Sequence, residues 1–156
     1  MSPSLGDAFP ANVRVDFAQK CITPGNVILC YSNAAGKDKR CVIVGINIDK
    51  SKVAVLLFNT DKPFIGNKRL ESLQVHFKSD GNPYLKHDSY LNCAHIEFVP
   101  YQTLIDEIIA NPDHVLDTMS KPDFDNICTV AANAKTASPK IIKTFGLSGY
   151  LFQSNN

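Results

Sequence analysis

Apolar residues follow two successive patterns along this chain, first the pattern of strands and then that of helices. From Pro24 to about Pro100, runs of β-branched and apolar residues alternate with turn residues, as expected for strands. The clearest runs are NVILCY (26–31), CVIVGINI (41–48), KVAVLLFN (52–59) and LQVHF (73–77). SYLNCAHIEFVP (89–100) fits a strand pair or one long bent strand, and the segment 79–88 before it is rich in turn formers. Five or six short strands without a helix between them predict a small barrel or sandwich.

After Pro100 the apolar spacing becomes helical. Leu104, Ile105, Ile108 and Ile109 recur three and four residues apart, which predicts a helix that lies on a core. Pro112 interrupts this helix, because proline fits only the first turn of a new one. Two further helical segments are expected, after Ser120 with Phe124, Ile127, Cys128 and Ala131 on one face, and after a Ser138 cap with Ile141, Ile142 and Phe145.

Composition limits the classes of protein to which the chain can belong. The 156 residues are enough for one domain with its own core, and a formal net charge of +1 excludes the strongly basic character of a nucleic-acid coat protein. The N-terminal residues lack the pattern of a signal peptide, and no apolar run has the roughly 20 residues of a membrane span. We therefore expect a cytoplasmic protein that is not bound to a membrane.

Cysteine and histidine spacing predicts neither a metal site nor a disulfide framework. The five cysteines are odd in number, widely spaced and without a CxxC pair, and the four histidines add no close ligand pair. Cys30, Cys41 and Cys93 lie in apolar runs, where a free cysteine behaves as a small hydrophobic residue. We expect reduced thiols, no metal and no cofactor.

Residues 31–60 hold the most informative combination of elements. A polar, glycine-containing loop ends at Arg40, where a strong strand begins, and a further strand ends at Thr60. A fixed positive charge beside a flexible loop at the mouth of a small β-structure is suited to binding a phosphate. The order PGNVILCY, glycine loop, Lys-Arg before CVIV, and a strand ending in NTDKP resembles the MazF/PemK toxin family. The resemblance covers about residues 24–104, with a weaker echo in SPKIIKTFGL (138–147).

The resemblance implies a fold class of α+β, mainly β. It would be a small SH3-like β-barrel of five to seven strands followed by a C-terminal helical segment. The corresponding division is a flexible N-terminal arm (1–20), the barrel (21–101), a helical extension packed on it (102–147) and a tail (148–156). It also implies the toxin of a type II toxin–antitoxin system, a metal-independent endoribonuclease (mRNA interferase) that cleaves single-stranded RNA. Its partners would be a cognate antitoxin protein and a second copy in a homodimer.

The candidate catalytic residues are Arg40, Thr60 and His87. Arg40 takes the position of the family's arginine, and its guanidinium would stabilise the extra charge on phosphorus, while Thr60 would hydrogen-bond a phosphate oxygen or orient the 2′-hydroxyl. Of His87, Asp88 and His95, His87 is the preferred proton carrier, because histidine titrates near neutrality. The candidate RNA-binding residues are Lys37, Lys39, Lys62, Ser89 and Tyr90. Plainer interpretations are a surface charge for Arg40, a turn residue for Thr60 and a solvated face for the lysines.

The sequence also departs from the family pattern. Asn26 stands where an acidic residue is usual, and Cys41 follows Arg40 where a proline is usual. Some members carry an arginine and an aspartate late in the barrel, where this chain has Asn92, Cys93 and Ala94. This departure favours an alternative, a non-catalytic SH3-like barrel that binds nucleic acid or a protein. A third alternative, an unrelated enzyme with Cys93 or Cys128 as nucleophile, ranks last because neither has a nucleophile signature around it.

Overall fold

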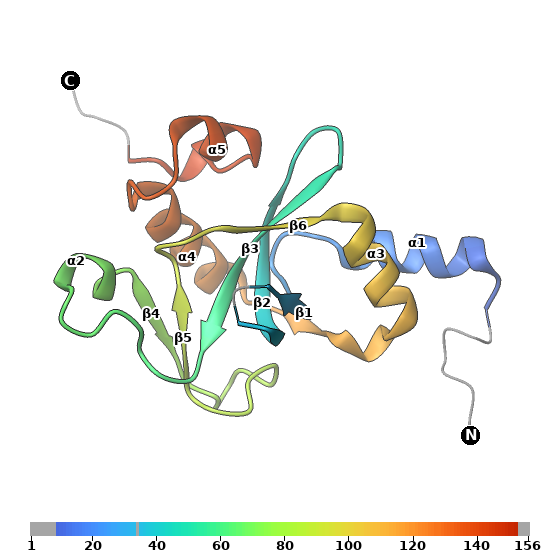
Figure 1. Cartoon of the computed structure of the whole chain (residues 1–156), viewed down its shortest axis with the longest axis horizontal. Helices are drawn as coiled ribbons and strands as arrows, with labels where there is room; N and C mark the ends of the chain where they lie inside the picture. The colour runs from blue at the N-terminus through green and yellow to red at the C-terminus, as the bar shows by residue number, and fades with distance from the viewer. Residues whose placement is uncertain (1–8, 34, 153–156) are drawn as a thin grey trace.

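Residues 9–33 and 35–152 are described by a computed structural model, in which a sheet lies between two groups of helices (Figure 1). The strands are β1 (Asn26–Ser32), β2 (Lys37–Ile46), β3 (Lys52–Asn59), β4 (Gln74–Phe77), β5 (Ser89–Asn92), β6 (Glu97–Pro100) and β7 (Val115–Thr118). The α-helices are α1 (Ala11–Cys21), α2 (Lys68–Glu71), α3 (Tyr101–Ala110), α4 (Lys121–Asn133) and α5 (Pro139–Thr144). Two 3₁₀ turns are η2 (Pro112–His114) and η3 (Ser148–Tyr150).

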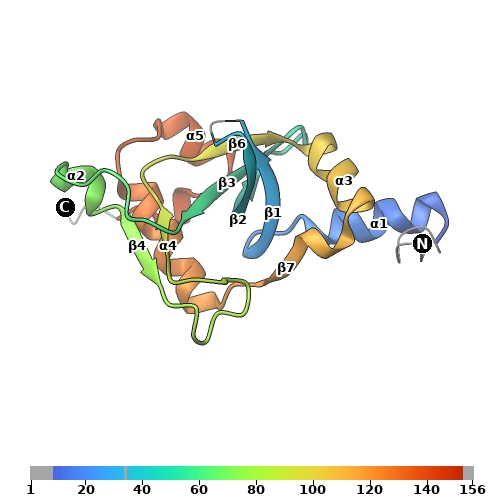
Figure 2. The same cartoon turned by 60° about the horizontal axis from the view of Figure 1, so that its bottom comes forward.

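All strand pairs are antiparallel, and the pairing order is β4-β5-β3-β2-β1-β7, with β6 joined to β3 outside this path. Strand β3 takes β6 as a partner along its first half and β5 near its end. The sheet is strongly twisted and bent around β3 (Figure 2). The α+β, mainly-β class, the number of strands and the helical segment after Pro100 are therefore confirmed, although the strand pairings within the described residues form an open path rather than a closed ring.

Alternating side chains of the central strands supply two cores, one on each face of the sheet. Val42 and Leu56 belong to the core that α4 and α5 cover, whereas Ile43 and Val55 belong to the core that α1 and α3 cover. In Figure 1, α4 and α5 accordingly lie on one side of the central strands and α1 and α3 on the other. Gly45 sits at an irregularity of the β2–β3 register, where a Cβ atom would lie 2.9 Å from the Cβ of Phe145. The absence of a side chain there lets the end of α5 approach the sheet.

The predicted apolar faces of the C-terminal helices are confirmed. Leu104, Ile105 and Ile108 are buried from α3. Ile127 and Cys128 are buried from α4 together with Ala131 and Ala132. The Ser138 side chain accepts a hydrogen bond from the Ile141 amide at 3.3 Å, as a helix cap does.

Three sequence-based boundaries need correction. The flexible arm expected for residues 1–20 is wrong from Ala11 onward, because α1 packs against α3 and buries Ala18; residues 1–8 lie outside the described part of the chain. The extension at 102–147 is not purely helical, since β7 pairs with β1. The tail at 148–156 begins with the turn η3.

Segment 89–100 forms two strands that pair with different halves of β3 rather than with each other.

None of the helices in the described ranges is long and apolar enough to cross a membrane.

Candidate functional site

Arg40 connects strand β2 to the loop between β4 and β5. Its Nε donates a hydrogen bond of 2.8 Å to the carbonyl oxygen of Tyr84, whose side chain is buried. The ring of Tyr84 lies 6.0 Å from that of Phe58, centroid to centroid. The guanidinium is thus partly buried under the loop, and this bond fixes its orientation.

Thr60 lies near Arg40 in the register of the sheet. The pairing of Cys41 with Leu57 places Phe58 opposite Arg40, and Thr60 follows two residues later, just beyond the end of β3. Thr60 is exposed. The two residues that the sequence singled out as catalytic therefore belong to the same end of the sheet.

The loop that holds Tyr84 is closed by hydrogen bonds near its two ends. Asp88 Oδ1 accepts hydrogen bonds from the Ser79 amide at 2.8 Å and from Ser79 Oγ at 3.2 Å. The Ser79 backbone bond, followed by the side-chain bond, holds the pKa of Asp88 below its usual value. His87 is exposed in this loop, whereas Ser89 is buried and its Oγ donates to the His87 carbonyl oxygen at 2.8 Å. The Ser89 hydroxyl thus already has an acceptor, which counts against its predicted role in RNA binding.

Most of the other predicted RNA-binding residues lie on the face of the sheet opposite to the Arg40 side chain. Lys39 Nζ donates to Asn59 Oδ1 at 2.8 Å, Asn59 is the register partner of Tyr90, and Tyr90 is the partner of His76. The rings of Tyr90 and His76 are 4.9 Å apart. Lys39, Asn59, Tyr90 and His76 form a row across β2, β3, β5 and β4, which we call the polar row.

A lysine from outside the polar row, Lys62, lies beside it. Lys62 Nζ lies 5.9 Å from the centre of the Tyr90 ring and 3.3 Å from Glu71 Oε1. Burial lowers the pKa of Lys39, and the charge of Lys37 lowers it further. Two members of the row, Asn59 and His76, are absent from the sequence-based candidates. In LQVHF (73–77) His76 stands between the apolar residues Val75 and Phe77, but only the strand register brings it beside Tyr90.

The segment that departs from the family pattern has a structural role. Asn92 Oδ1 accepts hydrogen bonds from Gln74 Nε2 at 2.9 Å and from the Ala94 amide at 3.0 Å, which shapes the turn after β5. Cys93 and Ala94 are buried there. These residues supply neither an acid nor a base to the surface.

Cys30, Cys41 and Cys93 are buried apolar groups, as the sequence predicted. Cys30, Cys41, Cys93 and Cys128 are buried, and the Sγ atoms of Cys30 and Cys41 lie 2.8 Å apart. Burial raises the pKa of Cys93 and of Cys128 to about 12. A thiol with such a pKa is almost fully protonated at neutral pH, which counts against either residue as a nucleophile.

Residues 9–33 and 35–152 contain no group of three or more His, Cys, Asp or Glu side chains arranged to hold a metal ion. Neither a scan against models of protein families nor a search of curated proteins found a match to this chain.

Proposed function

We propose that this protein acts on single-stranded RNA as a metal-independent endoribonuclease, the toxin of a type II toxin–antitoxin system that works in the cytoplasm. The polar row carries the proposal. Tyr90 and His76 lie side by side, and Lys39 and Lys62 flank them, so that the row combines flat rings for bases with cations for phosphates. Base stacking on an aromatic side chain contributes about 1–3 kcal/mol per base and tolerates any sequence.

Cleavage would take place at the nearby end of β2. Arg40 would place its remaining N–H groups on the phosphate that is attacked by the 2′-hydroxyl, and Thr60 would orient that phosphate. The products would be a 2′,3′-cyclic phosphate and a free 5′-hydroxyl. His87, three residues after Tyr84, is exposed and is our candidate for moving the proton.

Two protein partners belong to this proposal, a second copy of the chain and an antitoxin. An apolar groove of about 240 Å³ between α1 and α3 supports homodimer formation, because the side chains of Phe9, Val13 and Phe17 are exposed there. Sedimentation equilibrium would establish the mass of the assembly in solution.

One observation favours a second candidate function, a binding module without catalysis. Arg40 Nε is already engaged by the Tyr84 carbonyl oxygen, and its side chain lies on the face of the sheet opposite to the polar row. An RNA strand bound along the row would have to pass the end of β2 to reach it. Arg40 would then serve mainly to hold the loop.

The deciding experiment is incubation with a mixed-sequence single-stranded RNA in EDTA, followed by mapping of the fragment ends. Selective cuts that leave a 2′,3′-cyclic phosphate, lost in Arg40→Ala and kept in Arg69→Ala, would support the ribonuclease. Arg69 is a suitable control because it is an exposed arginine on α2. Binding without cleavage would support the binding module. If the protein neither bound nor cleaved the RNA, both candidate functions would be overturned.

A further inference from the structure

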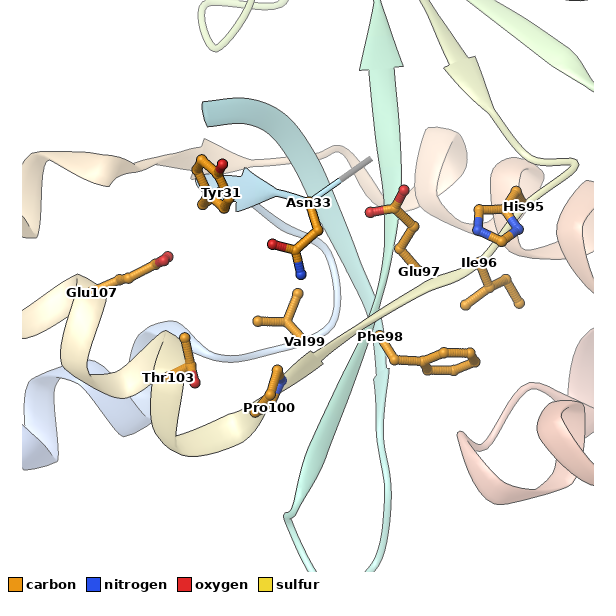
Figure 3. A pocket seen from close by; sticks show the side chains of 10 residues that line it. All are labelled: Tyr31, Asn33, His95, Ile96, Glu97, Phe98, Val99, Pro100, Thr103 and Glu107. Atoms are coloured by element: carbon orange, nitrogen blue, oxygen red, sulfur yellow. The ribbon is translucent and has the colours of Figure 1, made fainter. Parts of the chain in front are cut away.

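A second cavity, distinct from the Arg40 end of the sheet, opens between the end of β1, strand β6 and helix α3. Its volume is about 390 Å³, within the range of ligand pockets. Its lining includes Tyr31, Asn33, Glu97, Val99, Thr103 and Glu107. In Figure 3 the side chains of Tyr31 and Asn33 approach from one side, those of Glu97 and Val99 from β6, and those of Thr103 and Glu107 from α3.

Two carboxylates and one histidine, His95, line this cavity, and its lining within the described ranges includes no lysine or arginine. Glu97 comes from β6 and Glu107 from α3, so the two carboxylates reach the cavity from different elements. Lys39 is near enough to Glu97 for the two charges to interact, but Lys39 Nζ is bound to Asn59. Burial raises the pKa of Glu107, and Asp38 adds a further negative charge nearby that also raises it. The charge of His114 acts in the opposite direction and lowers the pKa of Glu107.

Glu107 has an unused acceptor. Its Oε2 atom is buried and has no hydrogen-bond donor among the described residues. A buried carboxylate oxygen without a donor is unfavourable, so a cation that enters the cavity beside Glu107 would stabilise the charge of this carboxylate. Burial, followed by the charge of Asp38, raises the pKa of Glu107, whereas the charge of His114 and a hydrogen bond from the Tyr31 backbone lower it.

The remaining walls suit an apolar stem that ends in a cation. Val99 and Pro100 offer apolar surface, and the half-exposed ring of Tyr31 offers a face for a cation. The Thr103 hydroxyl and the Asn33 amide can orient a planar or tetrahedral head group. The two carboxylates would repel a phosphate, so this cavity is unsuited to the backbone of a nucleic acid.

We propose that this cavity binds an alkylguanidinium or alkylammonium group, such as the side chain of an arginine in a peptide or a free diamine. Glu107 and Glu97 would accept its N–H groups, and Tyr31 and Val99 would cover its methylene stem. This site shares none of its lining residues with the Arg40 end or with the polar row, although the charge of Glu97 acts on Lys39 of that row.

Isothermal titration calorimetry tests this site with three probes. They are a capped Gly-Arg-Gly tripeptide, the same peptide with citrulline in place of arginine, and putrescine. Citrulline has nearly the shape of arginine but no charge, and we expect the arginine peptide to bind at least about tenfold more tightly, as expected when hydrogen bonds to a charged group are lost. Putrescine distinguishes a free amine from a side chain held in a peptide.

Glu107→Gln and Glu97→Gln should each weaken binding of the cationic probe by about ten- to a hundredfold. Glu71→Gln, which removes a carboxylate on α2 that pairs with Lys62, should leave the affinity unchanged. Equal unfolding midpoints in urea would show that the variants are folded. The site is overturned if neither cationic probe shows saturable binding, if citrulline binds as well as arginine, or if Glu107→Gln and Glu97→Gln bind as the wild type does.

Discussion

Lys39 and Arg40 are neighbours in the chain, yet their side chains form hydrogen bonds on opposite faces of strand β2. Lys39 Nζ donates to Asn59 Oδ1 and Arg40 Nε to the Tyr84 carbonyl oxygen, each at 2.8 Å. Successive side chains of a strand point to opposite faces, so a Lys-Arg pair within a strand cannot act as one basic patch. Lys39 belongs to the polar row, for which RNA binding is proposed. Arg40 supports the loop that also carries His87.

Lys39→Ala should therefore weaken RNA binding without unfolding the protein. If Lys39 neutralises one phosphate, the slope of log affinity against log salt should become shallower by about 0.7, the value for a single strand. Fluorescence anisotropy with a labelled RNA at several salt concentrations measures this slope. Lys52→Ala is the control, because it also removes one positive charge but at the start of β3, away from Asn59 at the end of that strand. It should leave the slope unaltered. An equal slope for wild type and Lys39→Ala would remove Lys39 from the RNA-binding surface.

Arg40→Ala should have a different signature. The variant loses the bond to the Tyr84 carbonyl oxygen, and we expect the free energy of unfolding to fall by about 1–2 kcal/mol. Urea unfolding gives this value, and Arg69→Ala should stay within about 0.5 kcal/mol of wild type. If Arg40→Ala abolishes cleavage without any loss of stability, the guanidinium acts on RNA rather than on the loop.

The sequence was sufficient to predict the elements that carry a strong local period. The β-branched runs became β1, β2 and β3, and the stripe of Leu104, Ile105 and Ile108 became the buried face of α3. Helix α1 was missed because its apolar residues Val13, Val15 and Phe17 alternate and stay exposed, while the side chain that it buries, Ala18, gives little signal. Strand β7 was missed because its four residues are too few to show an alternating pattern. The strand forms through its pairing with β1.

The candidate site could be predicted only in part, because its assembly depends on strand register. The sequence identified Lys39 and Tyr90 as candidates, but not the neighbours that join them. Asn59 links the two across three strands, and His76 packs beside Tyr90, through pairings between residues far apart in the chain. No local pattern in the sequence encodes such a pairing. The cavity at Glu107 is likewise formed by two segments that are distant in sequence, the end of β1 and the continuous stretch of β6 and α3.

Gly45→Ala should be strongly destabilising although it adds a single methyl group. The new Cβ would overlap the carbonyl oxygen of Phe145 and lie 2.9 Å from the Phe145 Cβ, so α5 would have to move away from the sheet. Such overpacking costs about 1–3 kcal/mol, which a shift of the urea midpoint would reveal. Gly149→Ala is the matched control, because nothing lies within 4 Å of a Cβ at that position. A Gly45→Ala protein as stable as wild type would mean that α5 does not pack closely at this point.

Asp88 should make the loop at 79–88 sensitive to acid. Its pKa is held below the ordinary value of 3.8 by the Ser79 bonds, so its contribution to stability is present above pH 3.8 and disappears as the pH falls through its folded pKa. NMR titration of the carboxyl group should place that pKa below 3.8. Ser79→Ala removes the longer bond to Oγ and keeps the 2.8 Å backbone bond, so the pKa should rise only part of the way. A pKa of 3.8 or above for Asp88 in the wild type would contradict the hydrogen bonds that Ser79 donates to its carboxylate.

Thiol reactivity separates the exposed cysteine from the buried ones and tests the remaining catalytic alternative. Cys21 is partly exposed, whereas the other four are buried, and burial raises the pKa of Cys93 and of Cys128 to about 12. Because only the thiolate reacts with iodoacetamide, we expect Cys21 to be labelled first in the folded protein, although burial raises its pKa too. The other four should react only after unfolding in urea, which peptide mass spectrometry can follow.

A Cys21→Ser variant serves as the control for this labelling, since it should take up almost no label until it unfolds. Rapid labelling of Cys93 or Cys128 in the folded state would contradict the burial of these two thiols and would restore a cysteine nucleophile as a candidate. Slow labelling of both would leave the side chains of the two sheet faces and of the loop at 79–88, which carries His87, as the groups able to act on a ligand. The chemistry of this protein would then rest on Arg40, the polar row and the Glu107 cavity rather than on sulfur.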